Sequence, residues 1–217
     1  MPLNLNSEDE IIRNKILVSQ RIDFLPLRKE YRDSIDQRLI EWISRLGAIA
    51  VPVPNCLIKS DSLNSWLKEM SPDAVLLSGG NDIGEFNLRD DTERNLLQYC
   101  EHNALPILGI CRGMQMLAKY SGAKLKKADC HVGIRHKLIK NSFGYGLPGK
   151  DVNSYHKMAL AECPTGYIIS AQSDDETIEA IVHSEKPWEG WMWHPERENE
   201  FMLSDLDRAR SILVPQN

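Results

Sequence analysis

The segment GICRG at residues 109–113 places a reactive cysteine, Cys111, between two glycines. The apolar run Pro106–Ile110 before it predicts a buried strand, and the residues from about Gly113 to Tyr120 predict a helix. In a strand–turn–helix elbow the glycines allow a sharp turn, and the positive end of the helix favours the thiolate. We therefore predict that Cys111 is a nucleophile. The alternative is a structural cysteine beside glycines that serve only packing.

A thiol nucleophile needs a base, and the base needs a group that orients it. The segment Trp193-His194-Pro195-Glu196 offers both, with a proline that restricts the backbone between them. We predict His194 as the general base and Glu196 as its orienting carboxylate. Taken without Cys111, the same segment would be interpreted as a surface turn.

Acyl transfer also needs donors for an oxyanion. The run Ala74–Leu77 predicts a strand that ends in Ser78-Gly79-Gly80, and this glycine pair can present backbone N–H groups. The N–H of Arg112, directly after the nucleophile, is the second candidate donor. A plain Gly-Gly turn is the simpler interpretation of the first feature.

Short apolar runs alternate with amphipathic stretches through the first half of the chain, which predicts βαβ units and a parallel sheet. The expected strands are Lys15–Ser19, Ala48–Val53, Ala74–Leu77 and Pro106–Ile110; the expected helices are Tyr31–Leu46, Asp61–Met70, Thr92–His102, capped by Thr92, and residues 113–120. In the second half, strands or hairpins are expected within Leu125–Asn141, Tyr167–Gln172 and Thr177–His183, and a helix over Ser204–Leu213. Ligands bind at the carboxyl ends of such strands, where Gly79, Gly80 and Cys111 lie. One α/β domain over residues 1–217 is the economical organisation.

Composition narrows the class of protein. The 217 residues are 42% hydrophobic and 26% charged, which is ordinary for a globular chain. The 26 basic and 31 acidic residues give a net charge of −5, a poor basis for binding nucleic acid. No apolar run is long enough to span a bilayer, and the polar N-terminus does not resemble a secretory signal. Five cysteines without a CxxC pair favour a reduced, cytoplasmic protein, and no histidine spacing suggests a metal. We expect no cofactor and no membrane partner.

Together the GICRGMQ, SGGND and WHPE segments resemble the class I glutamine amidotransferase superfamily, in order and in rough spacing. Val152-Asn153-Ser154-Tyr155-His156 is similar to the Val-Asn-Ser-x-His segment of stand-alone gamma-glutamyl hydrolases, such as those that act on gamma-glutamyl-gamma-aminobutyrate. The resemblance covers nearly the whole chain. It implies a flavodoxin-like three-layer α/β fold with a central, mostly parallel sheet.

The resemblance also implies roles for individual residues. Cys111 would form a glutamyl thioester, His194 would act as base and then acid, and Gly80 and Arg112 would supply the oxyanion-hole amides. Contacts with the gamma-glutamyl group would come from Gly79, Gln115, Ser154, Tyr155 and His156, the last three in the loop over Ser154–Met158.

Further segments are similar to a narrower group, the gamma-glutamyl-CDP-amidate hydrolases of bacterial capsule phosphoramidate synthesis. The group shares HVGxxHK, VNSYH and MWHPER segments, which stand here at residues 131–137, 152–156 and 192–197. A diphosphate leaving group needs cations, and we expect Arg135 and His136 to contact this part of the substrate. Arg112, Lys137 and Arg197 are further candidates, as are Arg28 and Arg32.

The leading hypothesis is thus a stand-alone cysteine hydrolase that releases glutamate from a small gamma-glutamyl substrate, with the nucleotide-linked amidate preferred. Three alternatives stay open: a gamma-glutamyl-gamma-aminobutyrate hydrolase, a glutaminase subunit that delivers ammonia to a separate synthetase, and a non-catalytic sensor. A related cysteine-elbow fold of the chaperone-protease type is more remote, because such proteins are not expected to carry His-Pro-Glu so near the C-terminus. The oligomeric state does not follow from the sequence.

Overall fold

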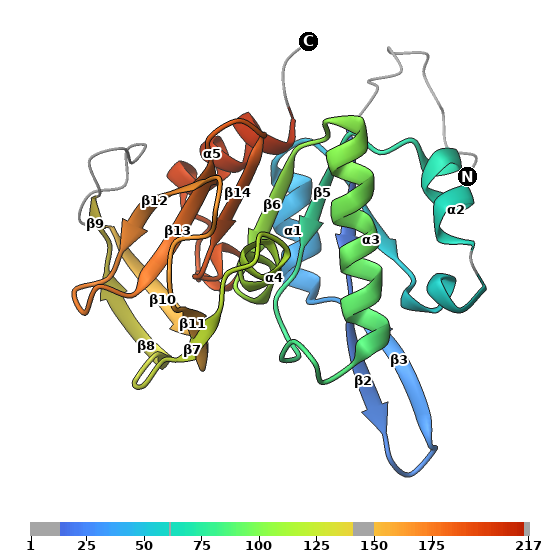
Figure 1. Ribbon diagram of the computed structural model, residues 1–217, viewed down its shortest axis with the longest axis horizontal. Helices are drawn as coiled ribbons and strands as arrows, with labels where there is room; N and C mark the ends of the chain where they lie inside the picture. Colours follow the sequence, from blue (N-terminus) through green and yellow to red (C-terminus); the bar gives the residue numbers. More distant parts are fainter. Residues whose placement is uncertain (1–13, 61, 141–149, 215–217) are drawn as a thin grey trace, which may run out of the picture.

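The computed structural model describes residues 14–60, 62–140 and 150–214. Their main feature is an eight-stranded mixed sheet (Figure 1) in the order β4 (Ile49–Val53), β1 (Lys15–Ser19), β5 (Ala74–Leu77), β6 (Ile107–Ile110), β14 (Trp188–Trp191), β13 (Ile178–His183), β12 (Tyr167–Gln172) and β9 (Ile139–Lys140). The first five strands pair in parallel and the last three add on antiparallel. The predicted mostly parallel α/β sheet is therefore confirmed.

Smaller elements complete this part of the chain. Two-stranded sheets are formed by β2 (Arg21–Leu25) with β3 (Glu30–Ser34), β8 (Val132–Lys137) with β10 (Asp151–Tyr155), and β7 (Leu125–Lys127) with β11 (Met158–Leu160). The helices are α1 (Gln37–Arg45), α2 (Leu63–Met70), α3 (Asn87–Asn103), α4 (Arg112–Tyr120) and α5 (Leu203–Leu213), with 3₁₀ turns η1 (Asn55–Ser60) and η2 (Pro195–Arg197).

Both faces of the main sheet are covered by helices, which produces three layers. Side chains alternate between the faces of a strand, so Ile16 and Val18 of β1 pack with α1 and α5, while Leu17 packs with α2, α3 and α4. Strands buried on both faces must be apolar throughout. The sequences AVLL and ILGI of β5 and β6 meet this requirement, and their residues are buried.

The predicted helix over Tyr31–Leu46 is wrong in its first part. Residues 31–34 instead belong to β3, which pairs with β2 in a hairpin that projects from the body of the molecule (Figure 1). The helix begins at Gln37 because the Asp36 carboxylate accepts the backbone N–H of Arg38 and caps it. The helical spacing of the apolar residues was real, but the cap determines where the helix starts.

The predicted cap at Thr92 is also wrong. Helix α3 starts five residues earlier, at Asn87, and Thr92 lies inside it with its hydroxyl donating to the carbonyl of Leu88. In the second half, β10, β11 and β14 were not predicted. The WEGW sequence of β14 lacks the β-branched residues that identify a strand, and only its place between β6 and β13 makes it one.

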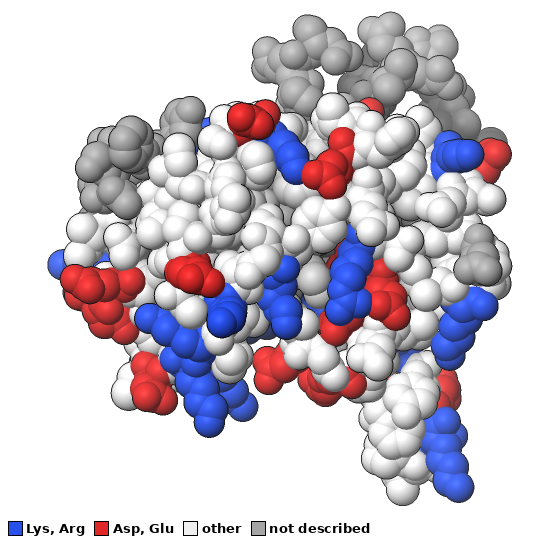
Figure 2. Space-filling model, in the orientation of Figure 1, with Lys and Arg blue, Asp and Glu red and all other residues white. Residues whose placement is uncertain are grey.

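Surface features add two observations. Among the described residues, no helix has the length and apolar character that crossing a membrane requires. On the face drawn in Figure 2, Lys and Arg gather near β7 and β11 and elsewhere are interspersed with Asp and Glu.

Candidate active site

Cys111 occupies the turn between β6 and α4, as the elbow pattern predicted. Its backbone has φ 51° and ψ −104°, a strained conformation for a residue with a side chain. Its N–H donates to the carbonyl of Trp191 over 2.6 Å, which fastens the turn to β14. The residue is only 7% exposed and lies at the N-terminus of α4, where the helix dipole favours negative charge.

The two glycines of the elbow are required by close packing. A Cβ on Gly109 would lie 2.6 Å from the carbonyl carbon of Gly113, and a Cβ on Gly113 would lie 2.1 Å from the carbonyl oxygen of Leu77. Both distances are too short for any side chain. The glycines therefore allow α4 to pack directly against β5 and β6, which brings Cys111 to the end of the sheet.

His194 follows β14 and lies between a nucleophile and a carboxylate. Its Nδ1 is 2.6 Å from Oε1 of Glu196, and both side chains are buried. Pro195 starts the 3₁₀ turn η2, which holds the two residues in this relation. Because Nδ1 faces the carboxylate, Nε2 is the nitrogen left for proton transfer.

The charges around His194 change its protonation. Burial lowers the pKa of His194, but the negative charges of Cys111 and Glu196, together with hydrogen bonds to both, outweigh burial and raise it to about 9. The ring is therefore an imidazolium at neutral pH, next to the Cys111 sulfur. In a cysteine–histidine pair of this kind the nucleophile is present as a thiolate.

The turn Ser78-Gly79-Gly80 after β5 is held by a buried arginine. Arg89 of α3 donates to the carbonyl oxygens of Ser78 over 2.8 Å, of Gly79 over 2.9 Å, and of Gly80. A Cβ on Gly79 would come within 2.7 Å of Cε1 of His194, so only glycine fits between this turn and the histidine ring. Arg89 thus fixes the turn that we predict to supply the Gly80 oxyanion donor.

The side chain of Arg112 has a structural place. It is buried and forms ion pairs with Asp90 and Glu93, and Glu93 also pairs with Arg89. The suggestion that the Arg112 guanidinium grips phosphate is therefore wrong. Its backbone N–H belongs to the first turn of α4, where N–H groups have no intrahelical partner, so the predicted oxyanion role of Arg112 concerns the backbone alone.

Two cavities meet at Gly80, His194 and Arg197. One of about 230 Å³ is also lined by Cys111, Gln115, Tyr155, His156 and Lys157; the other, of about 290 Å³, is also lined by Arg21, Asp23, Ser34, Asp36, Gly79 and Glu196. A substrate cut at Cys111 would place one half in each cavity.

The predicted glutamyl contacts are brought together only in part. Gln115 donates from Nε2 to the carbonyl of Met158 over 2.9 Å, and the Tyr155 ring packs edge-on against His194 with centroids 5.9 Å apart. Ser154 is fully buried, and its hydroxyl donates to the carbonyl of His131. The His156 ring is buried with Nε2 facing Glu179, so a substrate can reach its backbone but not its ring.

The expected leaving-group contacts separate in space. Arg135 pairs with Asp151 and Glu198 and lines neither cavity, and His136 faces Glu179 instead of Cys111. Both interpretations as substrate contacts lack support from the geometry. Of the other candidates, Arg197 lies on both cavities, with its guanidinium 4.9 Å from the centre of the Tyr155 ring.

The Arg28 and Arg32 candidates belong to the projecting hairpin. Arg28 lies in the turn between its strands, and Arg32 pairs with the neighbouring Glu30, so neither lines the cavities at Cys111.

Three residues with a place in the site were missed in the sequence. Asn153 accepts the backbone N–H of His194 over 2.9 Å and donates to its carbonyl over 2.8 Å. It stands within the Val-Asn-Ser segment, which was the available signal. Arg21 lines the larger cavity beside Gly80, and Arg89 braces the glycine turn; no local pattern distinguishes either from a surface arginine.

Comparison with known proteins agrees with this geometry. The family model "Glutamine amidotransferase class-I" matches residues 28–202. The gamma-glutamyl-CDP-amidate hydrolase of Campylobacter jejuni is 33% identical over 132 residues, which are 58% of this chain and 63% of that protein. The glutamine-hydrolysing subunit of GMP synthase from Thermococcus kodakarensis is 33% identical over 163 residues, 73% of this chain and 82% of the relative.

A solved structure extends the agreement to the fold. A protein of Thermoplasma acidophilum, provisionally assigned as a GMP synthase subunit, superposes with a TM-score of 0.70 and 25% identity, and 93% of each chain is covered. The family match spans the elbow, the glycine turn and the His-Pro-Glu segment. The chain therefore belongs to the class I glutamine amidotransferase family.

Proposed function

We propose that this protein hydrolyses a gamma-glutamyl amide through a thioester on Cys111. The observation that carries the proposal is the buried Cys111–His194–Glu196 arrangement, in which the histidine is held by a carboxylate and lies against the sulfur. Equivalent groups perform acyl transfer in cysteine hydrolases of unrelated fold.

In the first half of the proposed reaction, Sγ of Cys111 attacks the gamma-carbonyl carbon and a C–S bond forms. The carbonyl electron pair moves to oxygen, where the N–H groups of Gly80 and Arg112 stabilise the charge. The C–N bond then breaks, and Nε2 of His194 gives its proton to the departing nitrogen.

In the second half, Nε2 of His194 accepts a proton from water as the water oxygen attacks the thioester. The C–S bond breaks, and glutamate leaves with the sulfur again as thiolate. Glu196 keeps its hydrogen bond to Nδ1 throughout and stabilises the imidazolium in both halves.

The two cavities support an assignment of substrate halves. The glutamyl group would lie in the cavity with Gln115, Tyr155 and Lys157, which the family resemblance assigns to that group. The leaving group would lie beside Arg21 and Arg197 in the other cavity. Two guanidinium groups there, and the similarity to the Campylobacter hydrolase, support a phosphate-bearing leaving group such as gamma-glutamyl-CDP-amidate would provide.

The glutaminase alternative has its own support. GMP synthase subunits match a larger share of the chain than the hydrolase does, and a subunit of that kind would deliver ammonia to a partner synthetase. The two functions use the same cysteine chemistry and differ in the leaving group and in the need for a partner.

The deciding experiment measures glutamate release by the purified chain alone. L-glutamine, gamma-glutamyl-gamma-aminobutyrate and gamma-glutamyl-CDP-amidate are offered in parallel, with Cys111→Ala as the control. Turnover of one conjugate that disappears in the variant supports a stand-alone hydrolase and identifies its leaving group. Silence on all three, relieved by a synthetase, favours the glutaminase subunit.

A second measurement tests the phosphate assignment. Arg197→Ala should raise KM for the nucleotide conjugate far more than KM for a gamma-glutamyl anilide, whose leaving group carries no phosphate. Equal changes for both substrates would remove the reason for placing phosphate near Arg197.

A further inference from the structure

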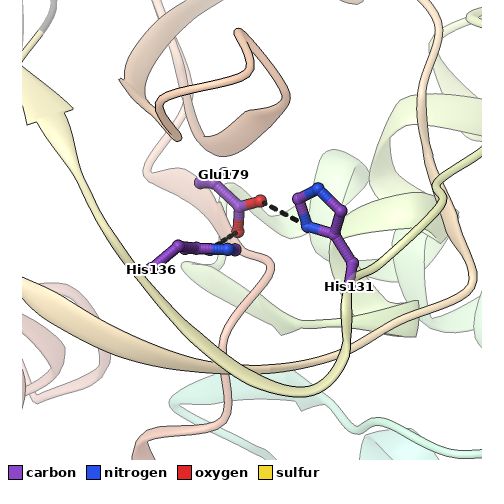
Figure 3. A group of neighbouring side chains, drawn as sticks. All are labelled: His131, His136 and Glu179. Carbon is purple, nitrogen blue, oxygen red and sulfur yellow. Dashed lines mark ion pairs between the residues drawn. The ribbon is translucent and has the colours of Figure 1, made fainter.

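A second group of buried ionisable side chains lies beside the cleft and has no part in the proposed reaction. His131 precedes β8, His136 belongs to β8, His156 follows β10, and Glu179 lies in β13. Figure 3 shows His131 and His136 directed at the two oxygens of Glu179. Glu179 is completely buried, and His131 and His156 are 4% and 2% exposed.

The inner atoms of this cluster face one another without hydrogen bonds. Nδ1 of His131 is 3.7 Å and Nε2 of His156 is 3.5 Å from Oε1 of Glu179, and Nε2 of His136 is 3.4 Å from Oε2. All five of these buried atoms lack a hydrogen-bond partner. A buried polar atom without a partner costs about 1–3 kcal/mol, so five together need an explanation.

The outer nitrogens show which atoms face inward without a proton. Nε2 of His131 lies 2.8 Å from a carboxylate oxygen of Asp175, and Nδ1 of His156 lies 3.1 Å from the carbonyl of Met158. Both partners can only accept, so these nitrogens carry the ring N–H. A neutral ring has a single N–H, so the inner nitrogens of His131 and His156 direct lone pairs at the oxygens of Glu179.

Lone pairs that converge on a carboxylate repel unless a cation lies between them. Tetrahedral zinc with ligand bonds of about 2.0–2.1 Å separates neighbouring ligand atoms by about 3.4 Å, close to the distances observed here. The outer contacts, a carboxylate for one ring and a backbone carbonyl for another, are those that orient metal-ligating histidines.

We propose that His131, His136 and Glu179, whose ligand atoms all lie within 4.8 Å of one another, bind a divalent transition-metal ion with His156 as the fourth ligand. Three imidazoles and one carboxylate are a typical zinc set, and tetrahedral placement disfavours copper. The site differs from the Cys111 centre in every ligand.

Four protein ligands with almost no exposure indicate a structural metal, because a catalytic metal keeps an open position. The ion would join β8 and the end of β10 to β13 of the main sheet. Strand β10 carries Asn153, which holds the backbone of His194, and Tyr155, which packs on its ring. The metal would therefore stiffen the wall that positions the catalytic histidine.

The test uses the full chain with Cys111→Ser, which removes the cleft thiol as a competing ligand, expressed without a polyhistidine tag. Metal content is measured by mass spectrometry, and the chelator-stripped protein is titrated with Zn²⁺ by calorimetry and with Co²⁺ by visible absorption. We expect about one ion per chain, the intense Co²⁺ spectrum of a tetrahedral site, and a higher Tm with Zn²⁺.

Variants assign the binding to these residues. Glu179→Gln and His136→Asn should weaken Zn²⁺ binding at least tenfold, and Asp175→Asn, which removes the outer contact of His131, should weaken it about 10- to 100-fold. His102→Asn, an exposed histidine of α3, is the matched control and should bind as the parent does.

Two results would overturn the proposal. One is a folded parent protein that binds neither Zn²⁺ nor Co²⁺ at micromolar concentrations, which would leave paired imidazolium rings as the explanation of the cluster. The other is parent-like affinity in Glu179→Gln. The parent titration decides the question even if a variant fails to fold, and its result is independent of the hydrolase activity.

Discussion

At the scale of single residues, the properties of His194 arise from its neighbours rather than from burial. Burial alone would leave the ring neutral, whereas Cys111 and Glu196 keep it charged. Its position depends on Asn153, which bonds both backbone groups of His194 and so restricts the strand end that carries it.

The raised pKa of His194 predicts a pH dependence of stability. The folded protein retains this proton up to about pH 9, whereas the unfolded chain releases it near the ordinary value of 6.5. Folded protein therefore binds more protons in this window, and the free energy of unfolding should fall as pH rises from about 6.5 to about 9. The decline should be on the order of 3 kcal/mol, since one pKa unit is about 1.4 kcal/mol.

Urea unfolding at a series of pH values measures this decline. Glu196→Gln, which removes one of the charges that raise the pKa of His194, should flatten it. A wild-type free energy of unfolding that stays constant over the window would contradict the predicted imidazolium.

Asn153→Ala should reduce kcat roughly 10- to 100-fold with little change in KM, because a displacement of His194 by a fraction of an ångström misaligns proton transfer. Steady-state kinetics on the substrate identified above measures the split. Asn103→Ala, which removes an amide at the exposed end of α3, should leave both constants unchanged. A rise in KM alone would assign Asn153 to substrate binding.

At the scale of elements, the site depends on how closely α4 approaches β5 and β6. The approach is possible because Gly109 and Gly113 lack side chains. Beside it, α3 contributes Arg89, Asp90 and Glu93, whose ion pairs with Arg112 and with one another join the glycine turn to the start of α4. Two turns far apart in the sequence are thus held by one buried network.

Gly113→Ala should lower the free energy of unfolding by at least about 3 kcal/mol, since its Cβ would lie 2.1 Å from the backbone oxygen of Leu77 and neither segment can move freely. Thermal and urea denaturation measure the effect. Lys119→Ala, an exposed position on the same helix, should change stability by less than about 0.5 kcal/mol. Equal effects of the two substitutions would mean that the packing of α4 is looser than described.

Arg112→Met should destabilise the fold by about 3–5 kcal/mol, because it leaves the buried carboxylates of Asp90 and Glu93 without this partner. The control Arg94→Met removes a half-exposed arginine of α3 and should have a small effect. Measurement of urea midpoints at neutral pH decides between them. A stable Arg112→Met protein that has lost only substrate affinity would restore the phosphate role of this side chain.

At the scale of the whole molecule, two cores lie on opposite faces of one sheet, and the β2–β3 hairpin projects away from both (Figure 1). Its side chains Phe24, Leu27 and Tyr31 are exposed, Leu27 completely. The hairpin bonds to the body mainly near its base, through Asn81 to Ile22 and Asp33 to Asn55.

Replacement of Phe24 and Leu27 by Ser should therefore change the free energy of unfolding by no more than about 0.5 kcal/mol each. Leu76→Ala, in the fully buried β5, should cost about 2–5 kcal/mol by comparison. Urea denaturation of the three variants provides the measurement. A loss at Phe24 or Leu27 as large as that at Leu76 would place the hairpin inside the cooperative core.

Local sequence determined the parts of this protein that depend on neighbouring residues. The apolar runs of β1, β5 and β6, the glycines around Cys111, and the His-Pro-Glu segment can each be identified within a few positions, because strand burial, a sharp turn and a short bridge between two side chains are local requirements. The carboxyl ends of parallel strands meet at one edge, so the meeting of Cys111 with the glycine turn also followed.

Only the tertiary structure decided which charged residues serve the site. Arg112 and Arg135 have the same local features as substrate-binding arginines, yet carboxylates of Asp90, Glu93, Asp151 and Glu198 hold them elsewhere. Likewise, His131, His136 and Glu179 show no ligand spacing along the chain and meet because β8 folds against β13. The partner of a long charged side chain depends on which distant segments come near, and the sequence does not encode that locally.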